Sequence, residues 1–261
     1  LLADPFSMDA MALLAGLDAA YPGRPKVGGL ASGGQSPGSH LLFQDAAIHR
    51  EGAVGMAITG AAEILPLVSQ GCRPIGPRCV ITKGEHNVIR ELAGRPALGV
   101  IREIVEGLEG RDRDLASTGL LVGRVVDEAK SEFHRGDFLI RGLVGADEAS
   151  GAVAVGDLIR RGQTLQLQVR DGMTADEDLR ALLGHHAPAL KARPPAGALV
   201  FSCNGRGVGM YGDADHDSRL LREAVPDLPL AGFFCNGEVG PIGNRTFLHG
   251  FTSSVGFLVP R

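Results

Sequence analysis

Two groups of polar residues follow apolar segments in the C-terminal part of the chain. Asn204, Gly205 and Arg206 come directly after the apolar run 198–203, and Glu238 follows the run 230–235. Open α/β sheets bind ligands beyond the carboxyl ends of their strands. A guanidinium can bind a carboxylate or phosphate through two hydrogen bonds, and glycine amides let an anion approach the backbone. Arg206 is therefore either a ligand contact held out into solvent by its flanking glycines or an arginine packed over a tight turn.

The second group belongs to a segment that resembles one near the N-terminus. It has polar residues at positions where the N-terminal segment has small ones. Cys235, Asn236 and Glu238 correspond to Ala31, Ser32 and Gly34. We expect Asn236 and Glu238 to bind an amino group, whereas Cys235 is better explained as a small buried side chain. The residues that we expect to contact a ligand are Ser32, Gly33, Asn204, Gly205, Arg206, Cys235, Asn236, Gly237, Glu238 and His249.

Catalytic and metal chemistry are weaker alternatives. A nucleophilic Cys203 or Cys235 would need a base such as His249 or His216, and no nucleophile elbow or phosphate loop occurs. Acidic residues and a histidine crowd positions 213–217, but they lack the spacing of a calcium loop, and Asp217 suits a helix N-cap. We therefore expect neither a catalytic residue nor a metal site.

Composition excludes several classes of partner. The 261 residues carry a formal charge of −4 with scattered Lys and Arg, which argues against nucleic acid. No apolar stretch approaches the roughly 20 residues of a membrane span. Four cysteines without a C-x-x-C spacing suit a reducing compartment, so we expect a cytoplasmic protein. Because Leu1 lies within an apparent strand, we expect residues of this fold to precede it.

Periodicity predicts a mixture of helices and strands. Apolar spacing predicts helices over 7–20, 96–108 and 217–225, and a capping box at Thr174 opens another. Strands are predicted at 53–59, 64–68, 78–82, 120–126, 137–144, 151–155, 164–170 and 198–203, with a charged connector at 110–117. Alternation of polar and apolar residues over 164–170 favours an antiparallel sheet. The predicted fold is α/β with mixed or antiparallel sheets covered by helices.

An internal repeat relates the two ends of the chain. Pro22, Pro25, Gly28 and Gly33 recur without a gap as Pro226, Pro229, Gly232 and Gly237. Each copy follows a strand and a helix. We expect two related halves, produced by duplication, whose glycine-rich turns lie at comparable positions beside a cleft.

Several motifs resemble those of the FIST family, named for F-box and intracellular signal transduction. The similar stretches are 27–33, 68–76, 91–97, 202–207, 232–241 and 247–252, in the family's order. The resemblance implies an N-terminal domain over 1–94, a C-terminal domain over 95–261, and a sensory module for small molecules such as amino acids. Some members bind haem and report nitric oxide, and a eukaryotic branch joins an F-box.

The leading hypothesis is a small-molecule sensor whose ligand is an amino acid or a small carboxylate. Arg206 would bind the carboxylate of such a ligand, and a signalling output protein would be its partner. The resemblance leaves two alternatives, a haem-binding gas sensor with a ligand such as His249 or His134, and a protein-interaction scaffold of the F-box adaptor type.

Overall fold

The computed structural model describes residues 1–261 and divides into two compact units. One, here called the sandwich unit, comprises Leu1–Gly71 and Ala175–Arg261. The other, the inserted unit, is the continuous segment Cys72–Thr174. The division expected between residues 94 and 95 falls inside the inserted unit, where β8 pairs with β9. The two compact units are therefore not the two halves of the sequence.

The inserted unit is an antiparallel sheet with two helices. Its strand order is β12-β11-β10-β13-β7-β8-β9, and β12 also pairs with β8. The strands are β7 (Cys72–Glu85), β8 (Val88–Leu92), β9 (Arg95–Pro96), β10 (Leu120–Val125), β11 (Phe138–Asp147), β12 (Ala152–Val155) and β13 (Thr164–Arg170). Helix α2 (Ala97–Glu106) buries Ala97, Val100 and Ile101 in the core of this unit, as its apolar spacing predicts.

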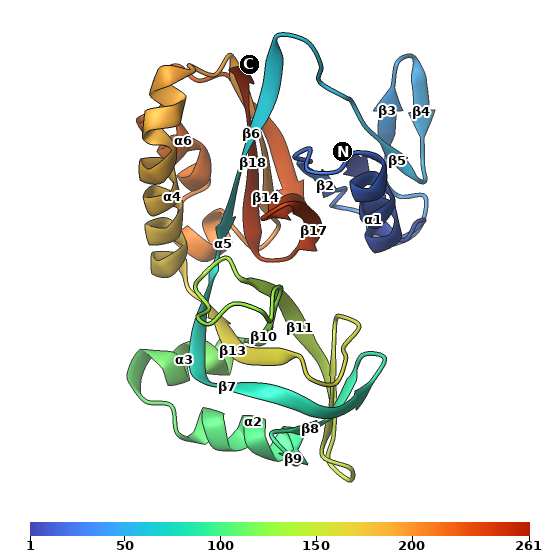
Figure 1. Ribbon diagram of the computed structural model, residues 1–261, viewed down its shortest axis with the longest axis vertical. Coiled ribbons are helices and arrows are strands. Elements are labelled where there is room, and N and C mark those ends of the chain that lie inside the picture. The colour runs from blue at the N-terminus through green and yellow to red at the C-terminus, as the bar shows by residue number, and fades with distance from the viewer. The chain divides into compact units, whose positions relative to one another are not determined.

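A second sheet forms the centre of the sandwich unit, in the order β15-β14-β18-β6. Its strands are β6 (Ala62–Gln70), β14 (Gly197–Cys203), β15 (Leu230–Cys235) and β18 (Thr252–Pro260). Helices α4 (Gly172–Ala192) and α6 (His216–Ala224) cover one face of it (Figure 1). Leu179, Leu220 and Phe257 are completely buried there. The short helix α5 (Val208–Tyr211) follows β14.

The opposite face of that sheet packs on a five-stranded sheet with the order β17-β16-β2-β1-β5. Its strands are β1 (Leu2–Ala3), β2 (Gly28–Leu30), β5 (Ala53–Val54), β16 (Glu238–Ile242) and β17 (Arg245–His249). Val27, Phe201 and Cys235 form the small core between the two sheets. Helix α1 (Ala10–Ala20) lies against β17, and the β3 (Leu42–Gln44) and β4 (Ala47–His49) hairpin lies beside β5 (Figure 1).

The two glycine-rich turns occupy corresponding places in the sandwich unit. β1 pairs in parallel with β2, and β14 pairs in parallel with β15. A Cβ at Gly28 would lie 1.9 Å from the carbonyl oxygen of Leu1, and one at Gly232 would lie 1.8 Å from that of Val200. Only glycine permits these approaches. The ends of the turns meet, since the Leu30 amide donates to the Gly237 carbonyl at 2.8 Å.

The predicted fold class, α/β with mixed and antiparallel sheets, is confirmed. The strand at 164–170 matches β13, but the strand expected over 53–59 is limited to Ala53–Val54. The charged connector expected at 110–117 is wrong, because Gly110–Thr118 forms helix α3 with no buried residue. Charged helices without an apolar face give no periodic signal. None of the helices combines the length and apolar character needed to cross a bilayer.

Candidate functional site

Arg206 is buried, which corrects the expectation that its flanking glycines hold it in solvent. Its side chain is 1% exposed. Arg206 donates from Nε to Oδ2 of Asp217 at 2.8 Å and from Nη2 to Oδ1 at 3.0 Å. The guanidinium also lies over the ring of Tyr211, 5.5 Å from its centroid. Arg206 therefore makes the two hydrogen bonds that we expected with a ligand carboxylate to the carboxylate of Asp217 instead.

Asp217 connects Arg206 to a short chain of charged groups. It lies in the first turn of α6, whose N-cap is Asp215, so the expected N-cap role of Asp217 is wrong. His216 places Nδ1 3.0 Å from Asp217 Oδ1 and Nε2 2.9 Å from Asp176 Oδ1. Burial alone would raise the pKa of Asp217, but hydrogen bonds from His216 and Arg206 hold it well below its usual range. Burial lowers the pKa of His216, but the carboxylates of Asp217 and Asp176 raise it by more, so the net shift is upward.

Glu238 begins β16 and is fully buried. The amide and hydroxyl of Thr252 both donate to Oε2, at 3.1 and 2.8 Å. Burial raises the pKa of Glu238 to about 8, although these hydrogen bonds and the positive charge of Arg206 oppose the shift. Glu238 Oε1 and Arg206 Nη1 are buried and have no hydrogen-bond partner. These two side chains, expected to bind opposite ends of a ligand, therefore interact electrostatically inside the protein.

The other predicted residues are split between core and surface. Cys235 is fully buried, and burial raises the pKa of its thiol far above the usual value, with Glu238 and Cys203 adding to the effect. His249 is buried and has Nε2 3.0 Å from the Gly240 carbonyl. The residues that lie exposed or half-exposed near the strand ends are Ser32, Gly33, Asn204, Gly205, Asn236 and Gly237. Thus the predicted residues come from neighbouring strand ends but do not line one cavity.

A pocket of about 350 Å³ lies in the sandwich unit between α6 and strands β14 and β15. Its walls include the acidic residues Asp215 and Asp217, the basic residue Arg222 and the aromatic residues Phe233 and Phe234. Ser202, at the end of β14, donates to Asp217 at 3.0 Å and links the wall to the ion pair. This pocket, beside a parallel strand pair and a helix N-terminus, is the candidate functional site.

Sequence reasoning missed most of the residues that line this pocket. Asp215, Ser218 and Arg222 are spaced three and four residues apart, so they share one face of α6. That spacing was visible in the sequence, but the position of α6 beside β15 was not. Gly232 and Phe234 belong to the repeated segment, but an apolar residue and a glycine carry no signal of a binding site there.

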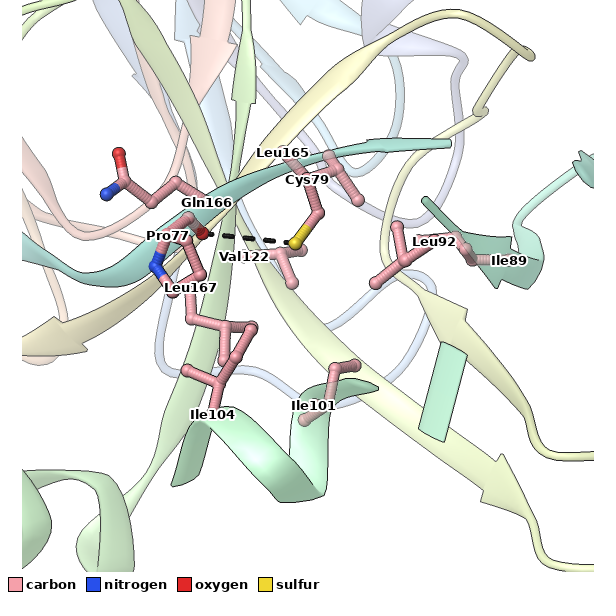
Figure 2. Close-up of a pocket in the computed structure, with 10 residues that line it drawn as sticks. All are labelled: Pro77, Cys79, Ile89, Leu92, Ile101, Ile104, Val122, Leu165, Gln166 and Leu167. Atoms are coloured by element: carbon pink, nitrogen blue, oxygen red, sulfur yellow. Dashed lines mark hydrogen bonds between the residues drawn. The ribbon is translucent and has the colours of Figure 1, made fainter. Parts of the chain in front are cut away.

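A small cavity lies in the core of the inserted unit. Its volume is about 10 Å³, which is room for one water at most. Figure 2 shows the apolar side chains around it, with Cys79 Sγ 4.0 Å from the Pro77 carbonyl oxygen. A cavity of this size and polarity does not bind a metabolite.

Haem, which the resemblance allows, does not fit the candidate site. None of the residues lining the pocket is a His, Cys, Met or Tyr that could ligate iron. His216 lies nearby but uses both ring nitrogens on carboxylates. Nor is any group of three or more His, Cys, Asp and Glu side chains arranged to hold a metal ion.

The fold and the site define a two-sheet sandwich with a polar pocket beside a parallel strand pair. Comparison with known families shows which family the chain belongs to. The FIST N domain model matches residues 1–95, and the FIST C domain model matches residues 97–241. The chain therefore belongs to the FIST family, whose domains are associated with sensing in signal transduction.

Mycobacterial proteins are similar over nearly the whole chain. The uncharacterized protein Rv0628c of Mycobacterium tuberculosis (strain H37Rv) is 45% identical over 259 residues, which are 99% of this chain and 67% of the relative. The uncharacterized protein Mb0898c of Mycobacterium bovis is 46% identical over the same shares of the two chains. The chain thus spans about two thirds of the length of these relatives.

Proposed function

We propose that this chain is a cytoplasmic small-molecule sensor that binds an amino acid or a small carboxylate in the pocket between α6 and β15. The single observation that carries the proposal is the pocket itself, a polar cavity beside a parallel strand pair whose walls hold both signs of charge. A pocket of a few hundred Å³ with a few polar groups is typical of ligand sites. A signalling protein that reads the bound state would be its partner.

Arg222 is the anchor for the ligand carboxylate in this proposal. It is exposed and forms no ion pair within the protein, in contrast to Arg206, which is committed to Asp217. A guanidinium with free donors can bind a carboxylate through two hydrogen bonds. Arg222 therefore takes the role that the sequence suggested for Arg206.

Asp215 and Ser218 suit the amino group of the ligand. They lie seven and four residues before Arg222, which places Asp215 and Arg222 about 10 Å apart along the helix axis. Flexible side chains at this spacing can contact both ends of a small zwitterion. Phe233 and Phe234 supply apolar surface for its side chain.

The matching β-α-β units support an origin of the site by duplication. Gly28 and Gly232 make the same close approach to a neighbouring carbonyl, and both units pair their strands in parallel. In this proposal only the second copy has acquired a ligand pocket, since Arg222 and Phe234 belong to it.

A thermal-shift screen with single amino acids and small dicarboxylates tests the proposal. Arg222→Ala is compared with Arg219→Ala, which removes an arginine from the same helix but outside the pocket, where it pairs with Asp213 and Glu223. A true ligand at about 100 times its Kd should raise the Tm of the wild type and of Arg219→Ala by about 5 °C or more. The proposal fails if no compound shifts the wild type, or if Arg222→Ala responds as strongly.

A further inference from the structure

His216 is the first residue of α6, and its ring is enclosed by three helices of the sandwich unit. Its side chain is 7% exposed. Nδ1 lies 3.0 Å from Oδ1 of Asp217 in α6, and Nε2 lies 2.9 Å from Oδ1 of Asp176 in α4. Tyr211, the last residue of α5, stacks on the imidazole with 3.5 Å between the ring centroids. The imidazole therefore connects α4, α5 and α6.

The two carboxylate contacts determine how many protons the ring carries. A carboxylate only accepts hydrogen bonds, and a neutral imidazole has one N–H and one lone pair. A neutral His216 would therefore direct a lone pair at either Asp176 or Asp217, at hydrogen-bonding distance. Only the imidazolium donates to both. The link between the two carboxylates is complete in the protonated form alone.

The ion pairs that meet at His216 are one positive charge short without this proton. They join four carboxylates to three guanidiniums. The carboxylates are Asp176, Asp213, Asp217 and Glu223, and the guanidiniums are Arg180, Arg206 and Arg219. The imidazolium supplies the fourth positive charge. Loss of its proton leaves this group of side chains with a net negative charge.

Two features oppose the proton on His216. Burial lowers its pKa, and the partial positive charge at the N-terminus of α6 disfavours a cation at the first residue. The hydrogen bonds and charges of Asp217 and Asp176 raise the pKa by more, so the net shift from 6.5 is upward. The nearby Arg206 is paired with both oxygens of Asp217. The ring therefore releases its proton at a higher pH than an ordinary histidine does.

Deprotonation breaks the contact with Asp176 in particular. Asp217 is 10% exposed, whereas Asp176 is 32% exposed and can turn toward water. A neutral ring keeps its remaining proton on Nδ1, because a buried acceptor loses more than an exposed one when its donor is removed. Nε2 then presents a lone pair to Asp176. The link from α6 to α4 is lost.

We propose that His216 is a proton-dependent clamp that fixes the start of α6 to α4 and thereby positions the wall of the pocket. Three residues of that wall lie within two positions of His216, namely Asp215, Asp217 and Ser218. His216 does not line the pocket, so it is a positioning residue and not a ligand contact. Loss of its proton frees the start of α6 and weakens binding. This consequence rests on the proposed function, whereas the clamp itself needs no ligand.

Tyrosine fluorescence tests the clamp without a ligand. The chain has two tyrosines and no tryptophan, so Tyr21→Phe leaves Tyr211 as the only such emitter. A stacked imidazolium quenches tyrosine emission more strongly than a neutral imidazole does. Emission in the Tyr21→Phe background should therefore rise with pH, with a midpoint above 6.5. A midpoint at or below 6.5 overturns the proposal.

Substitutions in the same background assign the transition to the clamp. His216→Gln should abolish it. Asp176→Asn, at a partly exposed position, should lower the midpoint by about one pH unit, because it removes the carboxylate at Nε2. His185→Gln is the matched control, since His185 is an exposed histidine of α4, and it should leave the midpoint unchanged. Circular dichroism verifies that the variants are folded. A transition that survives His216→Gln, or a midpoint insensitive to Asp176→Asn, contradicts the clamp.

Calorimetry connects the clamp to the pocket. The probe is the compound with the largest thermal shift in the screen described above, measured one pH unit below and one above the fluorescence midpoint. Its Kd for the wild type should rise about fivefold or more across this interval. His216→Gln should bind weakly at both pH values, and it retains any effect of the ionisation of Glu238 or of the probe. An unchanged Kd for the wild type overturns the proposed control of the pocket. The absence of any binding compound instead refutes the proposed function and leaves the fluorescence result standing.

Discussion

Arg206 and Asp217 form a buried, two-point ion pair on which a set of neighbouring side chains depends. Ser202 and His216 both contact the carboxylate of Asp217, and His216 continues the chain of contacts to Asp176. Removing one member of such a pair leaves an uncompensated charge away from water. The pocket wall formed by Ser202 and Asp217 is therefore held in place by Arg206 and His216, which do not line the pocket.

Arg206→Ala is expected to lower the free energy of unfolding by about 3 kcal/mol or more, because Asp217 then remains buried without its guanidinium. Arg206→Lys should recover only part of the loss, since an ammonium cannot make the same pair of bonds. Urea denaturation measures both. Arg219→Ala, at an exposed arginine, should cost less than about 1 kcal/mol. Equal losses for Arg206→Ala and Arg219→Ala would contradict the importance of burial.

Glu238 makes stability depend on pH in a definite direction. Its pKa in the folded chain is about 8, against 4.5 for an ordinary glutamate. Between these values the folded chain keeps a proton that the unfolded chain has released, so the free energy of unfolding falls as pH rises. The fall stops above about pH 8. His216, whose pKa is also raised, acts in the same direction over its own range.

Glu238→Gln isolates the contribution of this carboxyl, because the amide cannot ionise. Arg206 and Cys235, the charged and titratable groups coupled to Glu238, are unchanged in the variant. Urea denaturation at several pH values should show a weaker decline for the variant, by up to about 1.4 kcal/mol per pH unit in the middle of the range. Parallel curves for wild type and variant would rule out the raised pKa.

At the residue scale, the polar residues that the sequence singles out differ from the expectation mainly in their burial. Arg206 is buried because the loop that carries it folds back onto α6, and Glu238 is buried at the start of β16 beside Thr252. Apolar periodicity reports whether a segment has a buried face, not which polar side chain finds a partner inside. Arg222 could not be predicted as a site residue, because an exposed arginine on a helix has no local sequence signal.

At the scale of elements, two glycines determine how closely the parallel strands approach. A Cβ at Gly232 would lie 1.8 Å from the Val200 carbonyl oxygen, so Gly232→Ala must separate β14 from β15. We expect a loss of about 3 kcal/mol or more in the free energy of unfolding, or an insoluble protein.

Gly16→Ala is the matched control for that substitution. Gly16 lies inside α1 with no atom within 4 Å of the added Cβ, so the change should stabilise the chain by about 0.5–1 kcal/mol through helix propensity. Thermal unfolding of the two variants gives opposite shifts in Tm if this account is right. A neutral Gly232→Ala would show that the strands tolerate a wider spacing.

Elements with strong local signals were predictable, and those defined by distant partners were not. β13 alternates polar and apolar residues, and α2 has an apolar stripe, so both were found. β5 has only two residues in its ladder because its partner β1 is equally short. The first half of α3 is charged and the helix has no buried residue, so its pattern gives no periodic helical signal.

At the scale of the whole molecule, the inserted unit has the features of an independent folding unit. It is continuous in sequence and has its own core, in which Ile81 and Val169 are completely buried. We expect residues 72–174, produced alone, to be soluble and to unfold cooperatively in urea. Val169→Asp should abolish that transition, because it buries an unpaired charge. A fragment without a cooperative transition would show that the unit depends on the rest of the chain.

The division into two units could not be read from the sequence. The family signatures meet near residue 95, and the chain at that point is a tight β8–β9 turn rather than a linker. Assigning Leu1–Gly71 and Ala175–Arg261 to one unit requires knowing that β6 pairs with β18. A pairing between strands so far apart in sequence leaves no local pattern.

The pairing of β6 with β18 also sets an order of events during synthesis. β6 leaves the ribosome well before its partner, Thr252–Pro260, is translated. The inserted unit is complete long before that, so it can fold while the nine residues of β6 still lack their ladder. Until β18 has emerged, β6 is a strand without its β18 partner, and we expect a chaperone that binds the nascent chain to bind there.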